Sequence, residues 1–464
     1  MTQEFSKPNG PRPGKNDLRP LPYLFIHLLV LLSLSTGCSL LLELNQCESD
    51  GDCVATSQCV EGLCAEVNRI NVRNHIVEDT TWTSDNVYVL ENLIMVVAPA
   101  TLTIEAGTTI LGRRNTGLVS LSGARLEAVG TRDNPIVFTS DKPVGQRLAG
   151  DWAGIAMVGQ ARTNRQNFAL RIITDQFDTR VGGDDDTWNC GTLRYVRVEF
   201  GGSEVDGQKA LNGITLAGCG SGTTVEYIQS HMSDDDGIAV FGGTVDIRYA
   251  VSTRAGDDGF DFDTGWRGTA QFLAIQQDPN GEEAIELENL AENPSALPQT
   301  DAQIYNFTII GSQQRISRQV GLYVKFGGRA VFSHGIITNS GGAGVYIEGP
   351  EAKAHAENGG IIVENTIFHE IGPEGNEYFR LVDGEDGFDG YEIYSHDEAN
   401  NLFGVDPGLA DPFNLDNPGW VPSPEFTTNV SPPPAGFDPT AVYRGAFSPS
   451  ATPWTEGWTA YPRH

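Results

Sequence analysis

Two short acidic stretches, SDDDGIAVF (Ser233–Phe241) and AGDDGFDFD (Ala255–Asp263), decide how this chain folds. Each stretch places aspartates and a glycine directly before an apolar run, and Asp236 and Asp258 are 22 residues apart. A turn that returns at a fixed spacing indicates that one structural unit is being repeated.

A similar period runs through the chain from residue 76 onward. Glu105 in TIEAG and Glu127 in RLEAVG are 22 residues apart, and GLYVKFGG (Gly321–Gly328) returns 23 residues later as GVYIEG (Gly344–Gly349). Each unit holds short alternating runs broken by Gly, Asn or Asp, a pattern typical of half-buried strands and tight turns.

A unit of about 20–25 residues cannot bury its apolar side alone, whereas stacked copies of it form a continuous core. The sequence lacks the L-x-x-L-x-L pattern of leucine-rich repeats and lacks helix-length amphipathic stretches. We therefore predict an all-β fold, a right-handed parallel β-helix (a solenoid) over residues 76–370. Residues 371–464 are proline-rich and aperiodic, and we expect this tail to lie along the solenoid and to cap its last coil.

The N-terminal segment has the pattern of an export signal. A mostly apolar run of twelve residues, Tyr23–Leu34, is too short to span a bilayer core of about 30 Å and is typical of a signal peptide. The Ser-Thr-Gly-Cys that follows resembles a bacterial lipobox, although Ser35 stands where that pattern prefers leucine. We predict a lipoprotein signal peptide over residues 1–37 and lipidation at Cys38, with an ordinary cleaved signal peptide or an uncleaved anchor as the alternatives. Residues 38–46 would form a tether.

The cysteine count agrees with an exported protein. Of seven cysteines, six remain once Cys38 is set aside, an even number in an oxidising compartment. Cys190 and Cys219 are predicted to pair with each other. The other four form a predicted disulfide-rich knot over residues 47–64, whose pairing the spacing leaves open: Cys47, Cys53, Cys59 and Cys64.

The net charge of −31 limits the partners of the chain. Like charges repel over a Debye length of about 8–10 Å, so the composition disfavours nucleic acid and any unassisted binding of polyanions. A polyuronate would need a bridging cation.

The two acidic turns should stack, because equivalent positions in neighbouring coils lie about 4.8 Å apart. Two unit charges at that distance repel by roughly 3 kcal/mol at an effective dielectric constant of about 20. Three interpretations follow: aspartates that cap turn N–H groups, a calcium site, or catalysis. The candidate metal ligands are Asp235, Asp236, Asp257 and Asp258, with Glu283, Glu286 and Glu288 as an extension.

The catalytic interpretation depends on the second half of AGDDGFDFD. Strand alternation would point Phe260 and Phe262 into the core and Asp261 and Asp263 outward, about 6.7 Å apart, within the range of an inverting carboxylate pair. If these acids lined an open groove, catalysis would be favoured, whereas burial in corners would disfavour it. Residues that could complete a catalytic or ligand-binding site are Arg254, Arg267 and Trp266.

Several stretches resemble a family of bacterial envelope lipoproteins with a parallel β-helix. They include ATLTIEAGTTI (Ala100–Ile110), GDWAGIAMVG (Gly150–Gly159), GTLRYVRVEFGG (Gly191–Gly202), the long stretch Leu211–Gly268 with both acidic turns, and WTEGWT (Trp454–Thr459). The resemblance implies the fold and a location in the cell envelope, and it implies no activity.

Together these observations predict an exported protein that a lipid anchors in the envelope, at the outer membrane or cell surface. We expect a non-catalytic binding or adhesion role towards a glycan or another surface protein, with calcium as a stabilising ion. The alternative is a polysaccharide lyase or glycoside hydrolase that acts on a face of the β-helix.

Overall fold

The computed structural model describes residues 57–60, 63–66, 68–170, 177–205, 211–381, 389–427 and 430–464. Gln46–His464 forms one compact unit. The predicted signal peptide over residues 1–37, Cys38, the tether over residues 38–46, and Cys47 and Cys53 lie outside the described residues. Among the helices that are described, none is long and apolar enough to cross a membrane.

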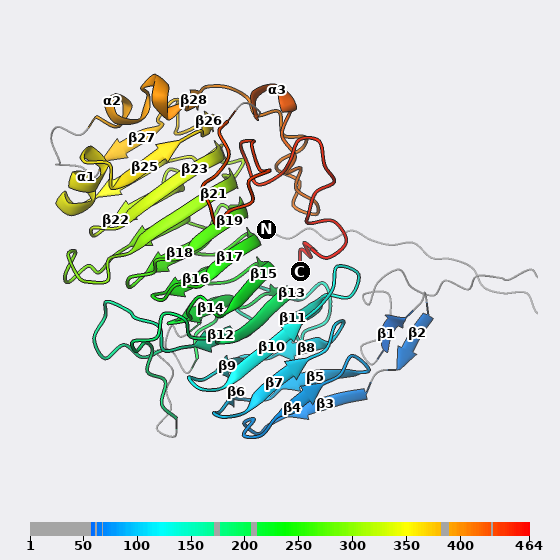
Figure 1. Ribbon diagram of the computed structural model, residues 1–464. Coiled ribbons are helices and arrows are strands. Elements are labelled where there is room, and N and C mark those ends of the chain that lie inside the picture. The colour runs from blue at the N-terminus through cyan, green and yellow to red at the C-terminus, as the bar shows by residue number, and fades with distance from the viewer. Residues whose placement is uncertain are drawn as a thin grey trace, which may run out of the picture. The chain divides into compact units, whose positions relative to one another are not determined.

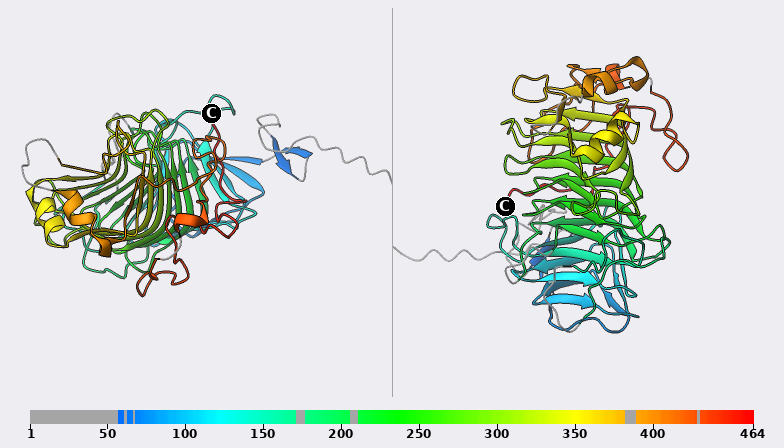
Figure 2. Two further views of the ribbon diagram at one scale, coloured as in Figure 1. Left: turned by 90° about the horizontal axis from the view of Figure 1, so that it is seen from above. Right: turned by 90° about the vertical axis from the view of Figure 1, so that its left-hand side faces the viewer.

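The coils form two parallel sheets, and each successive coil adds its strands to both sheets (Figures 1 and 2). The sixteen-stranded sheet, here sheet 1, consists of β3 (Asn68–Val72), β4 (Thr80–Trp82), β5 (Asn86–Leu90), β7 (Thr101–Ile104), β8 (Thr109–Gly112), β10 (Arg125–Val129), β11 (Ile136–Ser140), β13 (Gly191–Glu199), β15 (Thr224–His231), β17 (Asp246–Thr253), β19 (Thr269–Gln276), β21 (Asp301–Ile310), β23 (Arg329–Thr338), β25 (Ile361–Glu364), β26 (Ile367–His369) and β28 (Leu402–Phe403).

The ten-stranded sheet, here sheet 2, has one strand in each coil. Its strands are β6 (Leu93–Val96), β9 (Gly117–Ser120), β12 (Gly154–Val158), β14 (Ile214–Ala217), β16 (Ile238–Phe241), β18 (Phe260–Asp263), β20 (Glu283–Glu288), β22 (Val320–Lys325), β24 (Ala343–Glu348) and β27 (Phe379–Leu381).

The fold is the predicted all-β parallel β-helix. Ile238 of β16 pairs with Phe260 of β18, so the spacing of 22 residues between the two acidic turns is one coil. Both side chains are fully buried in one continuous core that the two sheets enclose. Burial of apolar surface of this kind contributes about 25 cal/mol per Å² and holds neighbouring coils together.

Sheet 1 is bent by a row of residues whose backbone takes the left-handed conformation. One residue in each of six successive coils has a φ between 48° and 65°, a region that costs energy for residues other than glycine. The aromatic members stack on one another, with ring centroids 4.5, 4.4 and 4.7 Å apart, which offsets part of that cost. The row is Tyr195, Tyr227, Tyr249, Phe272, Asn306 and His334.

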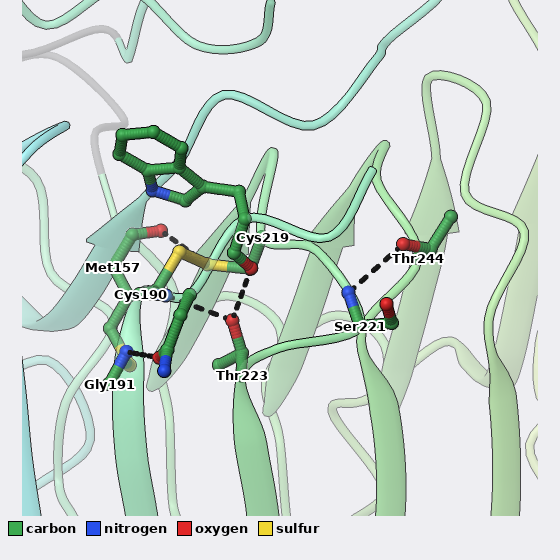
Figure 3. Close-up of a disulfide and its surroundings, with 9 residues drawn as sticks. Met157, Cys190, Gly191, Cys219, Ser221, Thr223 and Thr244 are labelled. Atoms are coloured by element: carbon green, nitrogen blue, oxygen red, sulfur yellow. Dashed lines mark hydrogen bonds between the residues drawn. A yellow bond between two sulfur atoms is a disulfide. The ribbon is translucent and has the colours of Figure 1, made fainter. Parts of the chain in front are cut away.

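The predicted disulfide between Cys190 and Cys219 is present (Figure 3), with Cα atoms 5.8 Å apart, within the usual range. It joins the residue before β13 to a residue shortly after β14. In the cysteine-rich segment, Cys59 of β1 (Ser57–Val60) lies opposite Cys64 of β2 (Leu63–Glu66) in an antiparallel pair. The side chains of this pair are outside the described part of the chain.

The C-terminal residues form two different structures. As far as residue 403 the chain still builds coils, because β27 and β28 pair with β24 and β26. Short helices lie in the same end region: α1 (Pro350–Glu357), α2 (Gly390–Tyr394) and the 3-10 helix Asp397–Ala399. The hydroxyl of Tyr394 donates to the carbonyl oxygen of Ile361 at 3.2 Å, which holds α2 against the last coil.

Beyond residue 403, and past α3 (Pro424–Thr427), the chain runs back along the outer side of sheet 1 (Figure 1). His334 Nε2 lies 2.7 Å from the carbonyl oxygen of Ser431, and His231 Nε2 lies 2.9 Å from that of Pro462. The carbonyl oxygen of His464 accepts from the amide of Gly145. Trp458 is fully buried and meets the rings of the aromatic row edge-on. Residues 431–464 therefore clamp coils from β23 back to the loop after β11.

Candidate functional site

The two acidic turns stack at the corner where the chain passes from sheet 1 to sheet 2. The backbone N–H of Asp258 donates to Asp236 Oδ1 at 3.2 Å, and the N–H of Glu283 donates to Asp258 Oδ1 at 2.9 Å. Asp236 and Asp258 are both buried, Asp258 with 4 % of its surface exposed. Each carboxylate thus caps an amide of the next coil, the arrangement that the turn-capping interpretation requires.

Burial of this corner shifts its acids towards the neutral form. Loss of solvation raises the pKa of Asp236 well above its ordinary value, and the nearby carboxylates of Asp235 and Asp257 raise it further. Burial, followed by the charge of Glu286, raises the pKa of Asp258 in the same way. Burial raises the pKa of Glu283 to about 7. A buried cluster of like charges keeps some of its protons near neutral pH.

Carboxylates also gather here in a way that suits a hard cation. Two groups each bring one oxygen from three residues within 4.8 Å of one another. Calcium takes six to eight oxygen ligands, so either group would supply part of a coordination shell and leave the rest to carbonyl groups or water. The groups are Asp235, Asp236 and Asp257, and Asp258, Glu283 and Glu286. The four predicted ligands are therefore divided between two groups, and Glu283 and Glu286 join Asp258.

The residues of β18 alternate as predicted, but they do not form an open pair. Phe260 and Phe262 are fully buried in the core. On the opposite face, Asp261 is half-buried and its Oδ1 has no hydrogen-bond partner among the described residues. Asp263 is buried, and its carboxylate accepts from the amide of Thr264. Burial raises the pKa of both aspartates well above the ordinary value.

Trp266 does not contact a ligand-accessible surface. It is fully buried, stacks on Phe262 with ring centroids 4.3 Å apart, and donates from Nε1 to the carbonyl oxygen of Val245 at 3.0 Å. It has the same parity as Phe260 and Phe262, which are also buried in the core. Trp266 is therefore a core residue.

The two candidate arginines lie at opposite ends of the coil that contains β18. Arg254 precedes the strand and pairs with Asp278 at 2.8 Å, while Arg267 follows it and contacts Asp186 through two nitrogens, each at 3.1 Å. Each arginine is held by a local carboxylate, so the structure does not bring them together as one site. Buried acids, a core tryptophan and separated arginines disfavour the open groove expected of a catalytic set at these positions.

The structure assembles a different set of side chains on the outer face of sheet 2. Register aligns Asp261, Glu286, Tyr323, Tyr346 and Arg380 on five successive strands. A neighbouring row aligns Glu288, Lys325 and Glu348. We call these eight residues the sheet-2 strip.

Contacts within the strip hold its side chains in place. Lys325 Nζ lies 2.6 Å from Glu286 Oε1 and 3.2 Å from Glu288 Oε2. Burial lowers the pKa of Lys325 while both glutamates raise it, and the net shift is upward, so the ammonium keeps its charge. The rings of Tyr323 and Tyr346 stack with centroids 4.9 Å apart. Lys325 and Arg380 lie over these rings at 5.1 and 5.5 Å.

The strip begins where a cover over sheet 2 ends. On the earlier strands most outward residues are apolar, and residues of the loop after β12 pack onto them. From β18 onward the outward residues of the strip are polar and partly exposed, while Asp263 at the end of β18 is still buried. The repeats GLYVKFGG and GVYIEG carry the signal for this set, because Tyr323 and Lys325, like Tyr346 and Glu348, are two residues apart on one face of a strand.

A family model described as a pectate-lyase like beta helix domain matches residues 74–401. The comparison with curated proteins gives no match. Among solved structures, the crystal structure of the Dettilon tailspike protein (gp208) is similar at 10% sequence identity, with a TM-score of 0.25. The similarity covers 68% of this chain and 62% of the tailspike chain, so this chain spans less than two thirds of the tailspike's length. The family model matches more than half of the chain, and the protein therefore belongs to the pectate-lyase like beta helix domain family.

Proposed function

We propose that the protein is a lipid-anchored protein of the bacterial cell surface that binds carbohydrate through the sheet-2 strip without cleaving it. The N-terminal pattern that ends at Cys38 supports the anchor and the outer-membrane location. Membership of a pectate-lyase like family supports a carbohydrate partner.

One observation carries the proposal: a stacked pair of tyrosines lies beside a fixed ammonium on the outer face of sheet 2, where these side chains are partly exposed. The outward edges of these two rings give the C–H groups of a sugar an apolar contact, and rigid aromatic side chains lose little entropy on binding. Lys325 donates hydrogen bonds, whereas Glu288 and Glu348 accept them, so both roles of a sugar hydroxyl are met. Repetition of the coils spaces these groups along the strip.

A second candidate function, polysaccharide cleavage, rests on Asp261 and Glu286. These residues are direct neighbours on β18 and β20, and burial raises the pKa of both carboxyl groups. An acid that keeps its proton near neutral pH is what a glycosidase needs to protonate a leaving group.

A glycan array and a polysaccharide-degradation screen of the full-length protein test both functions. We expect binding without new reducing ends or unsaturated products. Tyr346→Ala and Glu288→Gln should each weaken binding roughly tenfold or less, the value of a lost ring contact or hydrogen bond. The control is Glu127→Gln, because Glu127 lies on the outer face of β10 in sheet 1. Cleavage products that disappear with Asp261→Asn or Glu286→Gln would replace binding by catalysis, and absence of any bound glycan would contradict the proposal.

A further inference from the structure

A cavity of about 720 Å³ lies apart from the sheet-2 strip, at the corner where earlier coils pass from sheet 1 to sheet 2. Four successive coils contribute to it, through the turn after β8, the loop between β11 and β12, and the segments after β13 and β15. Its volume is within the range of about 300–1,000 Å³ that ligand pockets occupy. The charged residues that carry the argument are Arg113, Arg114, Lys142, Asp151, Glu204 and Asp234.

A buried carboxylate fixes one wall of this corner cavity. The side chain of Asp151 is only 5 % exposed and accepts from Ser140 Oγ at 2.6 Å and from the amide of Leu148 at 3.0 Å. It also pairs with Lys142, whose side chain is 51 % exposed. Lys142 has three N–H donors, and only the one directed at Asp151 is used in this contact. Asp151 therefore positions the ammonium of Lys142, which keeps N–H donors for a ligand.

Arginines also line the cavity. Arg113 is held by Asp141 at 2.6 Å and by Glu91 at 3.3 Å, and 45 % of its side chain is exposed. Arg114 is exposed and forms no ion pair or side-chain hydrogen bond with any residue that the structure describes. Two exposed carboxylates of the lining, those of Glu204 and Asp234, are likewise not engaged by another described side chain.

The balance of these groups selects the chemistry of the ligand. Guanidinium and ammonium groups only donate hydrogen bonds, whereas carboxylates only accept them. The cavity holds three cations, Arg113, Arg114 and Lys142, and four carboxylates, because Asp141 also lines it. A polyanion would gain no net attraction there, and the chain as a whole carries a charge of −31. A neutral molecule rich in hydroxyl groups can bind both the cationic donors and the carboxylate acceptors, because each hydroxyl donates and accepts.

We infer that the corner cavity binds a neutral saccharide unit, whose vicinal hydroxyls accept from Arg114 and Lys142 and donate to Glu204 and Asp234. This inference rests on the proposed carbohydrate-binding function and adds to it a second site and a ligand class. The ligand inferred here differs from the acidic polymer that the family is named after. A polyuronate is negatively charged, so it would be attracted neither by the balanced charges of the cavity nor by the negative net charge of the chain.

The test is titration calorimetry of the full-length protein with neutral oligosaccharides from the array and, separately, with oligogalacturonate. Arg114→Ala and Glu204→Gln should each weaken binding of the neutral ligand about tenfold. Both side chains are exposed, so neither change disturbs the core. Arg125→Ala is the matched control, since Arg125 is an exposed arginine on β10 outside the cavity.

Each result decides the question. The inference is supported if both cavity variants lose affinity for the neutral oligosaccharide. The Arg125→Ala control should keep that affinity, and the response of each variant to oligogalacturonate should equal that of the wild-type protein. Binding that is lost with Tyr346→Ala but unchanged by both cavity variants leaves the proposed function standing and overturns the second site. Tight binding of oligogalacturonate that requires Arg114 overturns the ligand class. A protein that binds no saccharide overturns the proposed function itself.

Discussion

Replacing Asp258 with asparagine should stabilise the protein at neutral and alkaline pH. Asp258 Oδ1 accepts from the amide of Glu283, and an asparagine keeps an acceptor at that place while it removes a buried charge. Carboxylates one coil apart, at about 5 Å, repel by roughly 3 kcal/mol at an effective dielectric constant of about 20. Retained protons already relieve part of this repulsion, so the gain in unfolding free energy should be about 1–3 kcal/mol.

The sign of the pH dependence follows from the raised pKa values of Asp236 and Asp258. A group whose folded pKa lies above its unfolded value contributes stability that is complete below the unfolded pKa and is lost as pH rises through the folded one. The wild-type protein should therefore lose stability as pH rises from about 4 towards neutral, and Asp258→Asn should lose less of it.

Urea denaturation at about pH 4 and about pH 8, with a chelator present, measures the effect. The two proteins should be nearly equal at the lower pH and differ by about 1–3 kcal/mol at the higher one. Asp133→Asn, at an exposed aspartate, should change stability by less than about 0.5 kcal/mol. If Asp258→Asn is the less stable protein at about pH 8 without calcium, charge relief is the wrong account of this corner.

Four further predictions address the ion, the clamp, the disulfide and the anchor. Calcium should raise the melting temperature more than magnesium does, and equal effects at millimolar levels would remove the cation hypothesis. Trp458→Ala should cost about 3–5 kcal/mol in urea denaturation and expose the C-terminal residues to protease, whereas an unchanged digestion pattern would contradict the clamp. Replacing Cys190 and Cys219 with serine should cost about 3–4 kcal/mol, since the bridge spans 29 residues, and a change below 1 kcal/mol would refute that value. Cys38→Ala should move the protein to the soluble fraction, and unchanged membrane association would contradict the lipoprotein assignment.

The sequence period was enough to predict the coils and the stacking of the acidic turns. In a parallel β-helix, equivalent positions of neighbouring coils lie next to each other. Asp236 and Asp258 are one repeat apart in the sequence and are therefore neighbours in the structure. Side-chain parity within β18 was predictable for the same reason, because strand residues alternate between two faces. Trp266 was predicted wrongly as a ligand-contact candidate: it has the same parity as Phe260 and Phe262, and it is buried against Phe262 in the core.

Other features had no such local signal. Aromatic residues are poor candidates for left-handed backbone, so nothing in Tyr195, Tyr227 or Tyr249 marks the bend of sheet 1; neighbouring coils impose it. The corner cavity joins residues from four coils, among them Arg114 and Asp234, which are 120 positions apart. Long-range contacts of this kind require the fold before they can be identified.

The return of residues 431–464 across sheet 1 has a thermodynamic consequence for the whole chain. A solenoid held only by contacts between adjacent coils unfolds like a one-dimensional array, in which the ends fray and partly unfolded forms are populated. Here one segment touches β23, β15 and the loop near Gly145, so coils that are not neighbours share a common partner. Unfolding of any of these coils would break contacts with residues 431–464. We therefore expect the chain to unfold in a single cooperative transition and not by progressive fraying from its ends. Residues 431–464 are synthesised after the coils that they clamp, so those coils would become fully stable only once this segment has docked on them.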